Sequence, residues 1–292
     1  MQSGITQMME GKTCLVTGAS DGIGYAAALE LARLGAETIV VGRNAAKTEA
    51  AVARIVSETG NSSVRFLLAD LSSQQEVRKL AQQVKEQLTG LDVLLNNAGA
   101  IFLSRRQSVD GIEMTFALNH LGYFLLTTLL LDLLKASAPA RVVNVSSSSH
   151  FSPRTLPLED LASPGRGSGY KAYGRSKLCN VLFTYELARR LEGSGVTVNA
   201  LHPGLVRTSI ALNNGILGRI ANFSIGVRGI DVTRGAETSV YLASSPDVEG
   251  VTGKFFMDCQ PVPSSRLSYD TGLAAELWEL SERLSGGLSE YD

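Results

Sequence analysis

The residues best suited to chemistry in this sequence are a tyrosine and a lysine four positions apart, Tyr173 and Lys177. Residues at i and i+4 lie on one face of a helix, so the phenol and the ammonium can point into the same cleft. A nearby positive charge favours the phenolate and would lower the tyrosine pKa from its ordinary value of about 10. Such a phenol is suited to general acid–base catalysis.

A run of four serines supplies further candidate groups. Residues 141–149 read RVVNVSSSS, an apolar strand that ends in hydroxyl side chains. A hydroxyl at the carboxyl end of a buried strand can donate a hydrogen bond to negative charge that develops on a substrate oxygen. Ser146 and Ser147 are both candidates, because the run of serines leaves the register open.

Two segments near the N-terminus predict a dinucleotide site. Residues 17–24 read TGASDGIG between an apolar run and a helical pattern. Glycines at such a turn let a pyrophosphate approach the N–H groups at the start of the helix. Residues 41–44 read VGRN, without the acid that would bind the ribose 2′-hydroxyl of NAD. Arg43 can instead bind a 2′-phosphate with its planar guanidinium, so the sequence favours NADP(H).

Short apolar runs alternate with longer helical patterns, which is typical of βαβ units and a parallel sheet. The expected strands are residues 13–17, 38–41, 64–68, 93–95, 141–145, 196–201 and 254–257, and the expected helices include 24–34 and 74–88. This pattern predicts an α/β chain of one domain, 1–292, with a doubly wound Rossmann fold and a seven-stranded parallel sheet. Residues from about 10 to 145 would form its cofactor half, and residues from about 146 to 285 its catalytic and substrate half.

Two segments interrupt this alternation. Residues 148–170 are rich in Ser, Pro and Gly and predict a loop between a strand and a helix. Residues 205–235 combine scattered glycines with an apolar set, which favours a lid over disorder. The apolar set is Ile210, Leu212, Ile216, Leu217, Ile220, Phe223 and Ile225.

Composition excludes several classes of protein. A net charge of −1 gives no basis for binding nucleic acid. Cys14, Cys179 and Cys259 are an odd number without CxxC spacing, which indicates a reducing compartment, and the three histidines lack metal-ligand spacing. The N-terminus lacks a secretory signal pattern, and the apolar stretch 121–134 is shorter than the about 20 residues of a membrane span. We expect a cytoplasmic, metal-free protein in which this stretch forms a buried or interface helix.

Together these motifs resemble the short-chain dehydrogenase/reductase family, from Lys12 to about Leu284. The resemblance is carried by the spacing G-x-x-x-G-x-G in residues 18–24, by NNAG at 96–99, by DL at 70–71, by HPGLVRT at 202–208 and by the Tyr-x-x-x-Lys pair. It implies that the catalytic residues are Asn119, Ser147, Tyr173 and Lys177. It implies a cofactor site formed by Gly18, Ser20, Asp21, Gly22, Ile23, Gly24, Arg43, Asn44, Asp70, Leu71, Asn97, Ala98, Gly99, Tyr173, Lys177, Pro203, Gly204, Val206 and Thr208.

The resemblance also implies a reaction. NADPH would deliver a hydride to the carbonyl carbon of a small aldehyde or ketone, while Tyr173 donates the proton and Ser147 hydrogen-bonds the oxygen. The apolar set in residues 205–235 predicts that this substrate is lipophilic. Lys177 would hold the nicotinamide ribose and lower the Tyr173 pKa, and Asn119 would position a proton-relaying water. The family further implies a homo-oligomer, a dimer or tetramer, with residues 121–134 as one candidate contact.

Within the family, residues 119–124 (NHLGYF), residues 245–254 (SPDVEGVTGK) and the long gap before Tyr173 are similar to the retinol dehydrogenase-like branch. Residues 171–180 (KAYGRSKLCN) also resemble protochlorophyllide reductase, which reduces a C=C bond. That activity ranks low, because the chain lacks the extra insertion of those enzymes and has Ser147 where they carry threonine. A different class, a dinucleotide sensor or scaffold without turnover, can use the same fold. Such proteins often lose the tyrosine or the lysine, and this chain retains both.

Overall fold

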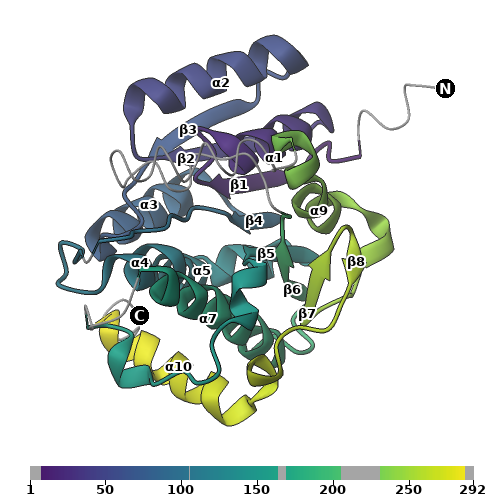
Figure 1. Cartoon of the computed structure of the whole chain (residues 1–292). Helices are drawn as coiled ribbons and strands as arrows, with labels where there is room; N and C mark the ends of the chain where they lie inside the picture. The colour runs from purple at the N-terminus through teal and green to yellow at the C-terminus, as the bar shows by residue number, and fades with distance from the viewer. Residues whose placement is uncertain (1–7, 105, 164–168, 205–230, 287–292) are drawn as a thin grey trace.

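The computed structural model describes residues 8–104, 106–163, 169–204 and 231–286 (Figure 1). The strands are β1 (Thr13–Thr17), β2 (Glu37–Gly42), β3 (Val64–Leu68), β4 (Val93–Asn96), β5 (Ala140–Val145), β6 (Val196–His202), β7 (Lys254–Met257) and β8 (Gln260–Pro261). The helices are α1 (Gly22–Arg33), α2 (Ala45–Thr59), α3 (Gln74–Gln87), α4 (Met114–Phe116), α5 (Gly122–Leu129), α6 (Leu131–Ala136), α7 (Gly169–Arg190), α9 (Val232–Ser244) and α10 (Thr271–Leu284). Shorter turns are the π-helical η1 (Ala117–Leu121) and the 3₁₀ turns η2 (Ser148–Phe151), η3 (Leu158–Asp160), η5 (Pro246–Val248) and η6 (Arg266–Tyr269).

The strands form one sheet in the order β3-β2-β1-β4-β5-β6-β7-β8. The seven predicted strands are confirmed as a parallel set, and the strand order reverses between β1 and β4. In an open α/β sheet, ligands bind outside the carboxyl ends of the strands at such a reversal. The eighth strand, β8, was not predicted and runs antiparallel to β7. Its two residues are too few to show a periodic pattern, and Pro261 is tolerated there because the strand lies at the sheet edge.

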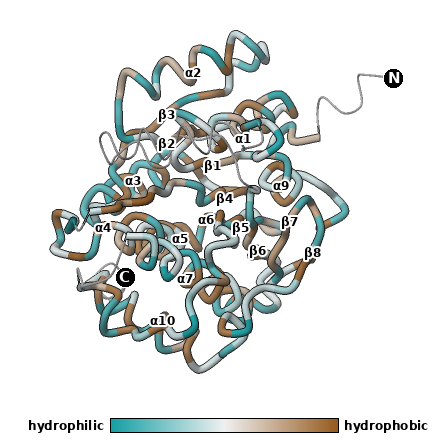
Figure 2. The backbone as a smooth tube through the Cα atoms, in the orientation of Figure 1, coloured by the Kyte–Doolittle hydropathy of each residue, from teal (hydrophilic) through white to brown (hydrophobic). Residues whose placement is uncertain are grey.

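Helices cover both faces of the sheet. Helices α1, α2 and α9 pack on one face, and α3, α5 and α7 pack on the other, with α10 outside α7 (Figure 1). Successive strand residues alternate between the two faces, so Leu15 joins one core while Cys14 and Val16 join the other. Figure 2 shows hydrophobic residues along the central strands and many hydrophilic residues along α2. Burial on both faces explains why the strands could be recognised as continuous apolar runs.

Three helical segments differ from the predictions. Helix α7 begins at Gly169, within the loop predicted for residues 148–170, and Tyr173 lies in its second turn. The loop predicted for residues 148–170 contains the turns η2 and η3 within its described part. Most of the predicted lid, residues 205–230, lies outside the described residues, and α9 begins within its last part, at Val232.

The apolar stretch 121–134 is interrupted rather than continuous. It runs from η1 into α5, breaks at Leu130 and continues as α6. Phe124 and Leu126 are fully buried in the core of the chain itself, which confirms the expectation of a buried segment. Within the part of the chain that the structure describes, no helix combines the length and apolar character of a membrane span.

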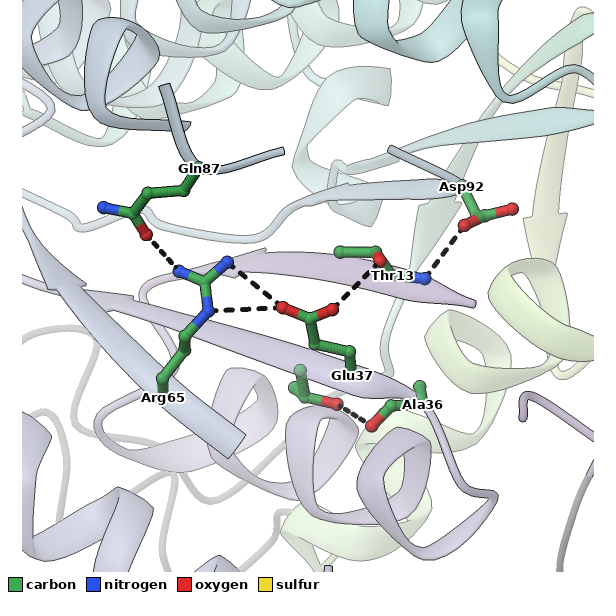
Figure 3. A network of polar contacts seen from close by, with 7 residues as sticks. Thr13, Ala36, Glu37, Arg65, Gln87 and Asp92 are labelled. Atoms are coloured by element: carbon green, nitrogen blue, oxygen red, sulfur yellow. Dashed lines mark hydrogen bonds and ion pairs between the residues drawn. The ribbon is translucent and has the colours of Figure 1, made fainter. Parts of the chain in front are cut away.

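A polar network joins the amino-terminal ends of the first strands (Figure 3). The Arg65 guanidinium donates to Glu37 Oε1 from Nε at 3.2 Å and from Nη2 at 3.1 Å, and it donates from Nη1 to Gln87 Oε1 at 2.6 Å. Thr13 donates from its hydroxyl to Glu37 Oε2 at 3.4 Å and from its backbone N–H to Asp92 Oδ2 at 2.9 Å. These contacts hold β1, β2, β3 and α3 together at the amino-terminal ends of the strands, opposite the predicted site at the carboxyl ends.

Candidate active site

The predicted glycine-rich turn lies where β1 passes into α1. Gly18 has φ +65°, and a Cβ there would stand 2.7 Å from the Ala98 Cα atom. A Cβ on Gly24 would overlap the Asn97 side-chain nitrogen. The turn therefore packs so closely on the end of β4 that only glycine fits at these two positions. Asp21 caps α1 by accepting a hydrogen bond from the Gly22 N–H at 2.7 Å.

A cavity of about 430 Å³ lies beside this turn, at the carboxyl ends of the strands. The predicted cofactor residues that line it are Gly18, Ser20, Asp21, Gly22, Ile23, Gly24, Arg43, Asn44, Asp70, Leu71, Asn97, Ala98, Gly99, Tyr173, Lys177 and Pro203. Gly204 is described but is not in that lining, and Val206 and Thr208 lie outside the described residues. The fold thus brings residues from six separate segments of the chain to one cavity.

Several lining residues were not predicted, and Lys47 is the most informative of them. Asn44 caps α2 by accepting a hydrogen bond from the Lys47 N–H at 3.0 Å, so Lys47 lies in the first turn of that helix. Arg43 and Lys47 are both exposed and line the same end of the cavity. The i, i+4 spacing of two basic residues directly after a strand could have revealed this pair.

The segment 96–99 holds the ends of β1 and β4 together. Asn97 donates from Nδ2 to the Thr17 carbonyl at 2.8 Å, and the N–H groups of Asn97 and Ala98 donate to Thr17 Oγ1 at 2.9 and 3.1 Å. After β3, two strands from β1, Asp70 Oδ1 accepts hydrogen bonds from the Ser72 N–H and hydroxyl at 2.9 and 2.7 Å. These contacts hold in place the segments that line the cavity, and the glycines of the lining take no part in them.

Tyr173 and Lys177 lie at one end of the cavity and are almost fully buried. Burial raises the Tyr173 pKa to about 12, although a hydrogen bond with Ser147 acts in the opposite direction. Burial also lowers the Lys177 pKa to about 7, and Lys177 Nζ donates to the Val145 carbonyl at 2.9 Å. The prediction of a lowered Tyr173 pKa is wrong for the protein alone. The amine lies 5.8 Å from the phenol ring centre and is itself desolvated, so it gives little compensating charge.

The two candidate serines face different partners. Ser146 is buried and donates its hydroxyl to the Lys177 backbone carbonyl at 2.7 Å. Ser147 is half-buried, and its hydroxyl interacts with Tyr173 and accepts a hydrogen bond from the Ser149 N–H at 3.2 Å. Ser146 lines the cavity and Ser147 does not. Of the two hydroxyls, that of Ser147 is the one placed with Tyr173.

Asn119 lies in the π-helical turn η1, a type of turn that occurs often at functional sites. Its side chain is fully buried and pairs with the Ala100 backbone, accepting from N at 2.9 Å and donating to O at 3.1 Å. It also donates to Ser176 Oγ at 3.1 Å, which links η1 to the turn of α7 that carries Tyr173. The Asn119 amide is thus engaged within the protein, and this residue does not line the cavity.

The residues present fit a nicotinamide dinucleotide. A Cβ on Gly99 would lie 3.2 Å from Asn119 Oδ1 and 3.4 Å from Lys177 Nζ, so this glycine keeps the space beside the lysine open. The start of α1 offers N–H groups to a pyrophosphate, and Arg43 offers charge at the far end. The cleft is kept open by glycines and extends from the start of a helix to a buried Tyr–Lys pair. Such a cleft suits an elongated, anionic cofactor.

Comparison with known proteins identifies the family. Residues 12–215 match the family model described as short chain dehydrogenase, and the chain belongs to this family. It is 43% identical to human retinol dehydrogenase 14, over 96% of this chain and 88% of that protein. It is 41% identical to human polyprenol dehydrogenase, over 95% of this chain and 86% of that protein.

A solved structure of a short chain dehydrogenase from Shigella flexneri, complexed with NADP, is similar as well. It has a TM-score of 0.68 and 26% identity, and the match covers 87% of this chain and all of that chain. The predicted family and its Rossmann-like α/β fold are therefore confirmed. The family binds a nicotinamide dinucleotide and catalyses oxidation and reduction, so the chain is an oxidoreductase of the retinol dehydrogenase-like kind.

Proposed function

We propose that this protein is an NADP(H)-dependent oxidoreductase that interconverts a lipophilic aldehyde or ketone and its alcohol. The observation that carries the proposal is the contact of the Ser147 hydroxyl with Tyr173, which itself lines one end of the dinucleotide cavity. Two hydroxyl donors at that place can hold a carbonyl oxygen and supply its proton.

The side chains divide the work as follows. A bound reduced nicotinamide dinucleotide supplies the hydride. Tyr173, whose pKa of about 12 keeps it protonated at neutral pH, donates the proton from its hydroxyl to the substrate oxygen. Ser147 Oγ donates a hydrogen bond to the same oxygen as negative charge develops there. Lys177 would hold the cofactor ribose, and Asn119 fixes the turn of α7 that carries Tyr173 through its bond to Ser176.

The preference for NADP(H) rests on Arg43 and Lys47. Both side chains line the cavity at the end of β2, where the ribose 2′ position of a dinucleotide lies in Rossmann folds. A 2′-phosphate carries nearly two negative charges, so two cations there favour it over a hydroxyl. The similar Shigella flexneri protein is complexed with NADP, in agreement with this choice.

The lipophilic substrate is supported by the relatives and by the surface near Tyr173. The names of two relatives specify retinol and polyprenol, which are both apolar alcohols. Three exposed apolar side chains, Phe151, Tyr170 and Leu103, come from segments that meet around Tyr173. Tyr170 interacts with Tyr173, the main chain at Leu103 packs on the first residue of α7, and the turn ending at Phe151 packs on the residue after Tyr173.

The test is NADPH oxidation with a panel of apolar aldehydes and ketones. We expect steady turnover in the wild-type protein and a loss of about 100- to 10,000-fold in Tyr173→Phe, because the proton donor is removed. NADPH binding, measured by fluorescence titration, should be retained in that variant. Tight NADPH binding without turnover of any carbonyl would contradict the proposal and support the sensor or scaffold instead.

Three further predictions stay open beside this proposal. A cytoplasmic location is suggested by three cysteines that are all unpaired, Cys14, Cys179 and Cys259. A homo-oligomer is suggested by the family, and light scattering of the purified protein would measure its order. The lid role of residues 205–235 can be tested by protection of that segment from proteolysis when NADPH and substrate are present.

A further inference from the structure

His150 lies directly beneath Ser147 and contacts it with a ring nitrogen. The ring is fully buried, and Nδ1 lies 2.7 Å from the Ser147 carbonyl oxygen. The His150 backbone N–H donates to the same oxygen at 3.1 Å. On the other side of the ring, Nε2 accepts a hydrogen bond from the Ser265 N–H at 3.1 Å. The ring thus connects the serine next to Tyr173 with the start of η6, more than a hundred residues later in the chain.

These two contacts fix the protonation of the ring. A backbone N–H can only donate, so Nε2 opposite Ser265 must carry a lone pair and no proton. A carbonyl oxygen can only accept, so Nδ1 opposite Ser147 must carry the proton. The geometry therefore requires the neutral, Nδ1-protonated tautomer of His150. A ring protonated on both nitrogens would set a donor against the Ser265 N–H.

The ring is also held in place by its neighbours. Its centre lies 4.0 Å from the Phe151 ring centre and 4.5 Å from that of Phe255. Phe255 belongs to β7 and is 1% exposed, so this side of the ring rests on the sheet core. A buried ring with both nitrogens bonded and aromatic contacts on two sides has little freedom to reorient.

We propose that His150 is a positioning residue that holds Ser147 through the Nδ1–H bond to the Ser147 carbonyl. Because the Ser147 carbonyl accepts hydrogen bonds from both the ring and the backbone N–H of His150, the Ser147 peptide group cannot rotate. The Ser147 hydroxyl therefore stays beside Tyr173. Displacing a group at the reacting centre by about 1 Å can cost about 100-fold in rate. This inference rests on the proposed function, in which Ser147 hydrogen-bonds the substrate oxygen.

Two substitutions separate the two ring nitrogens. The His150→Asn amide nitrogen reaches the place of Nδ1 and keeps a donor for Ser147, while the acceptor for Ser265 is lost. The His150→Gln amide oxygen reaches the place of Nε2 and keeps an acceptor for Ser265, while the donor for Ser147 is lost. Each variant loses one hydrogen bond and the ring contacts, so both should lose similar thermal stability. His150→Phe keeps an aromatic ring and loses both bonds.

We expect kcat to fall about 10- to 100-fold in His150→Gln and His150→Phe, and by about threefold or less in His150→Asn. The KM for the carbonyl and the Kd for NADPH should stay near wild type in all three. Equal losses in the Asn and Gln variants, or a wild-type kcat in His150→Phe, would overturn the inference. Ser147→Ala and Tyr173→Phe are assayed alongside. Wild-type turnover in both of these would refute the proposed function, whereas their inactivity together with equal Asn and Gln variants would refute only the role of His150.

A measurement on the unaltered protein tests the tautomer independently of how the variants fold. The sequence has only three histidines, so ¹⁵N-histidine labelling gives a simple two-bond ¹H–¹⁵N spectrum. The signals that disappear in His150→Asn assign the His150 ring. We expect a protonated Nδ1 and an unprotonated Nε2 at neutral pH. A protonated Nε2 would break the link to Ser265 and overturn the inference.

Discussion

The two ends of the parallel sheet are built from the same strands and present different side chains. At the carboxyl end, a cavity of about 430 Å³ ends at a buried lysine and a buried tyrosine with shifted pKa values. At the amino end, a cavity of about 910 Å³ is lined by charged residues that include Lys12 and Asp92. These two form an ion pair at 2.8 Å. Arg65 pairs with Glu37 close by at 3.1 Å (Figure 3).

The difference shows that the volume of a cavity does not identify the active site. In the larger cavity, Lys12 and Asp92 are partly exposed and neutralise each other, and exposed ion pairs of this kind are weak. The smaller one has glycines that leave room for a ligand and an amine that has lost its water without gaining an anion. Desolvated groups that lack a counter-charge are the ones whose protonation can respond to a ligand. We therefore assign the chemistry to the carboxyl end.

The largest change in activity that tests this comparison is expected at the two serines of the carboxyl end. Ser147→Ala should lower kcat about 100- to 1,000-fold, because it removes a donor to the developing oxyanion. Ser146→Ala should leave kcat within a few-fold and cost about 1 kcal/mol of stability, since it loses one bond to the Lys177 carbonyl. Steady-state kinetics and thermal unfolding of the pair would measure both. A larger rate loss in Ser146→Ala would reverse the assignment of the two serines.

The next effect concerns the stability cost of the buried amine. The folded Lys177 has a pKa of about 7, below its unfolded value of about 10.4, so between these values the unfolded chain binds a proton that the native state lacks. Stability of the wild type therefore rises with pH across this window, and the penalty is complete below about pH 7. Lys177→Met should be inactive yet more stable, by up to about 4 kcal/mol below pH 7, with the gain vanishing near pH 10. Denaturant unfolding from pH 6 to 10 would show it. A gain that does not depend on pH would mean that the amine is not desolvated.

A smaller effect is expected at the exposed cations of the cofactor end. Arg43→Gln should weaken NADPH binding about tenfold, because one charge-assisted hydrogen bond in a solvent-exposed position is lost. Lys47→Gln should act in the same direction with a smaller loss, and NADH binding should be nearly unchanged in both variants. Fluorescence titration with the two cofactors measures this directly. Equal weakening of NADPH and NADH would contradict a 2′-phosphate site.

The smallest effect is expected at the amino end. Glu37→Gln removes one partner of a pair whose side chains are about one-third exposed, so the stability loss should stay below about 1 kcal/mol. Turnover and cofactor affinity should be unchanged, because this network lies at the amino-terminal ends of the strands and the cavity at their carboxyl ends. Urea unfolding and NADPH oxidation would test both statements. A fall in kcat at constant stability would show that the two ends are coupled.

Much of the fold was predictable, because burial on both faces turns each central strand into an apolar run. Strands β1, β3 and β7 have the bounds that were predicted, and the other four predicted strands differ by one or two residues in total length. The start of α7 was misplaced, because residues 164–170 carry little helical pattern; in the structure its first residue, Gly169, packs closely on the main chain of Phe102 and Leu103. Strand β8 was missed, since it exists only by pairing with β7.

The site divides in the same way. The glycines, Arg43, Tyr173 and Lys177 were identified from residue type and spacing, Asn97 was identified through the family resemblance, and the fold brings them all to one cavity. Lys47 was overlooked because a lysine on a polar helix carries no functional signal by itself. Its role becomes visible only when the structure places it beside the end of β2. The choice between Ser146 and Ser147 needed the facing helix, which engages the first and leaves the second beside the phenol.

By itself the sequence determined the family, the presence of seven parallel strands and the residue types at the cofactor site, because these depend on local periodicity and short motifs. Only the tertiary structure decided the state of protonation of the reacting groups. The Tyr173 pKa lies above 10 and the Lys177 pKa far below 10.4, which is set by how much water each group loses when distant segments pack around it. The link from Ser265 through His150 to Ser147 was equally invisible, because it depends on contacts across more than a hundred residues of chain.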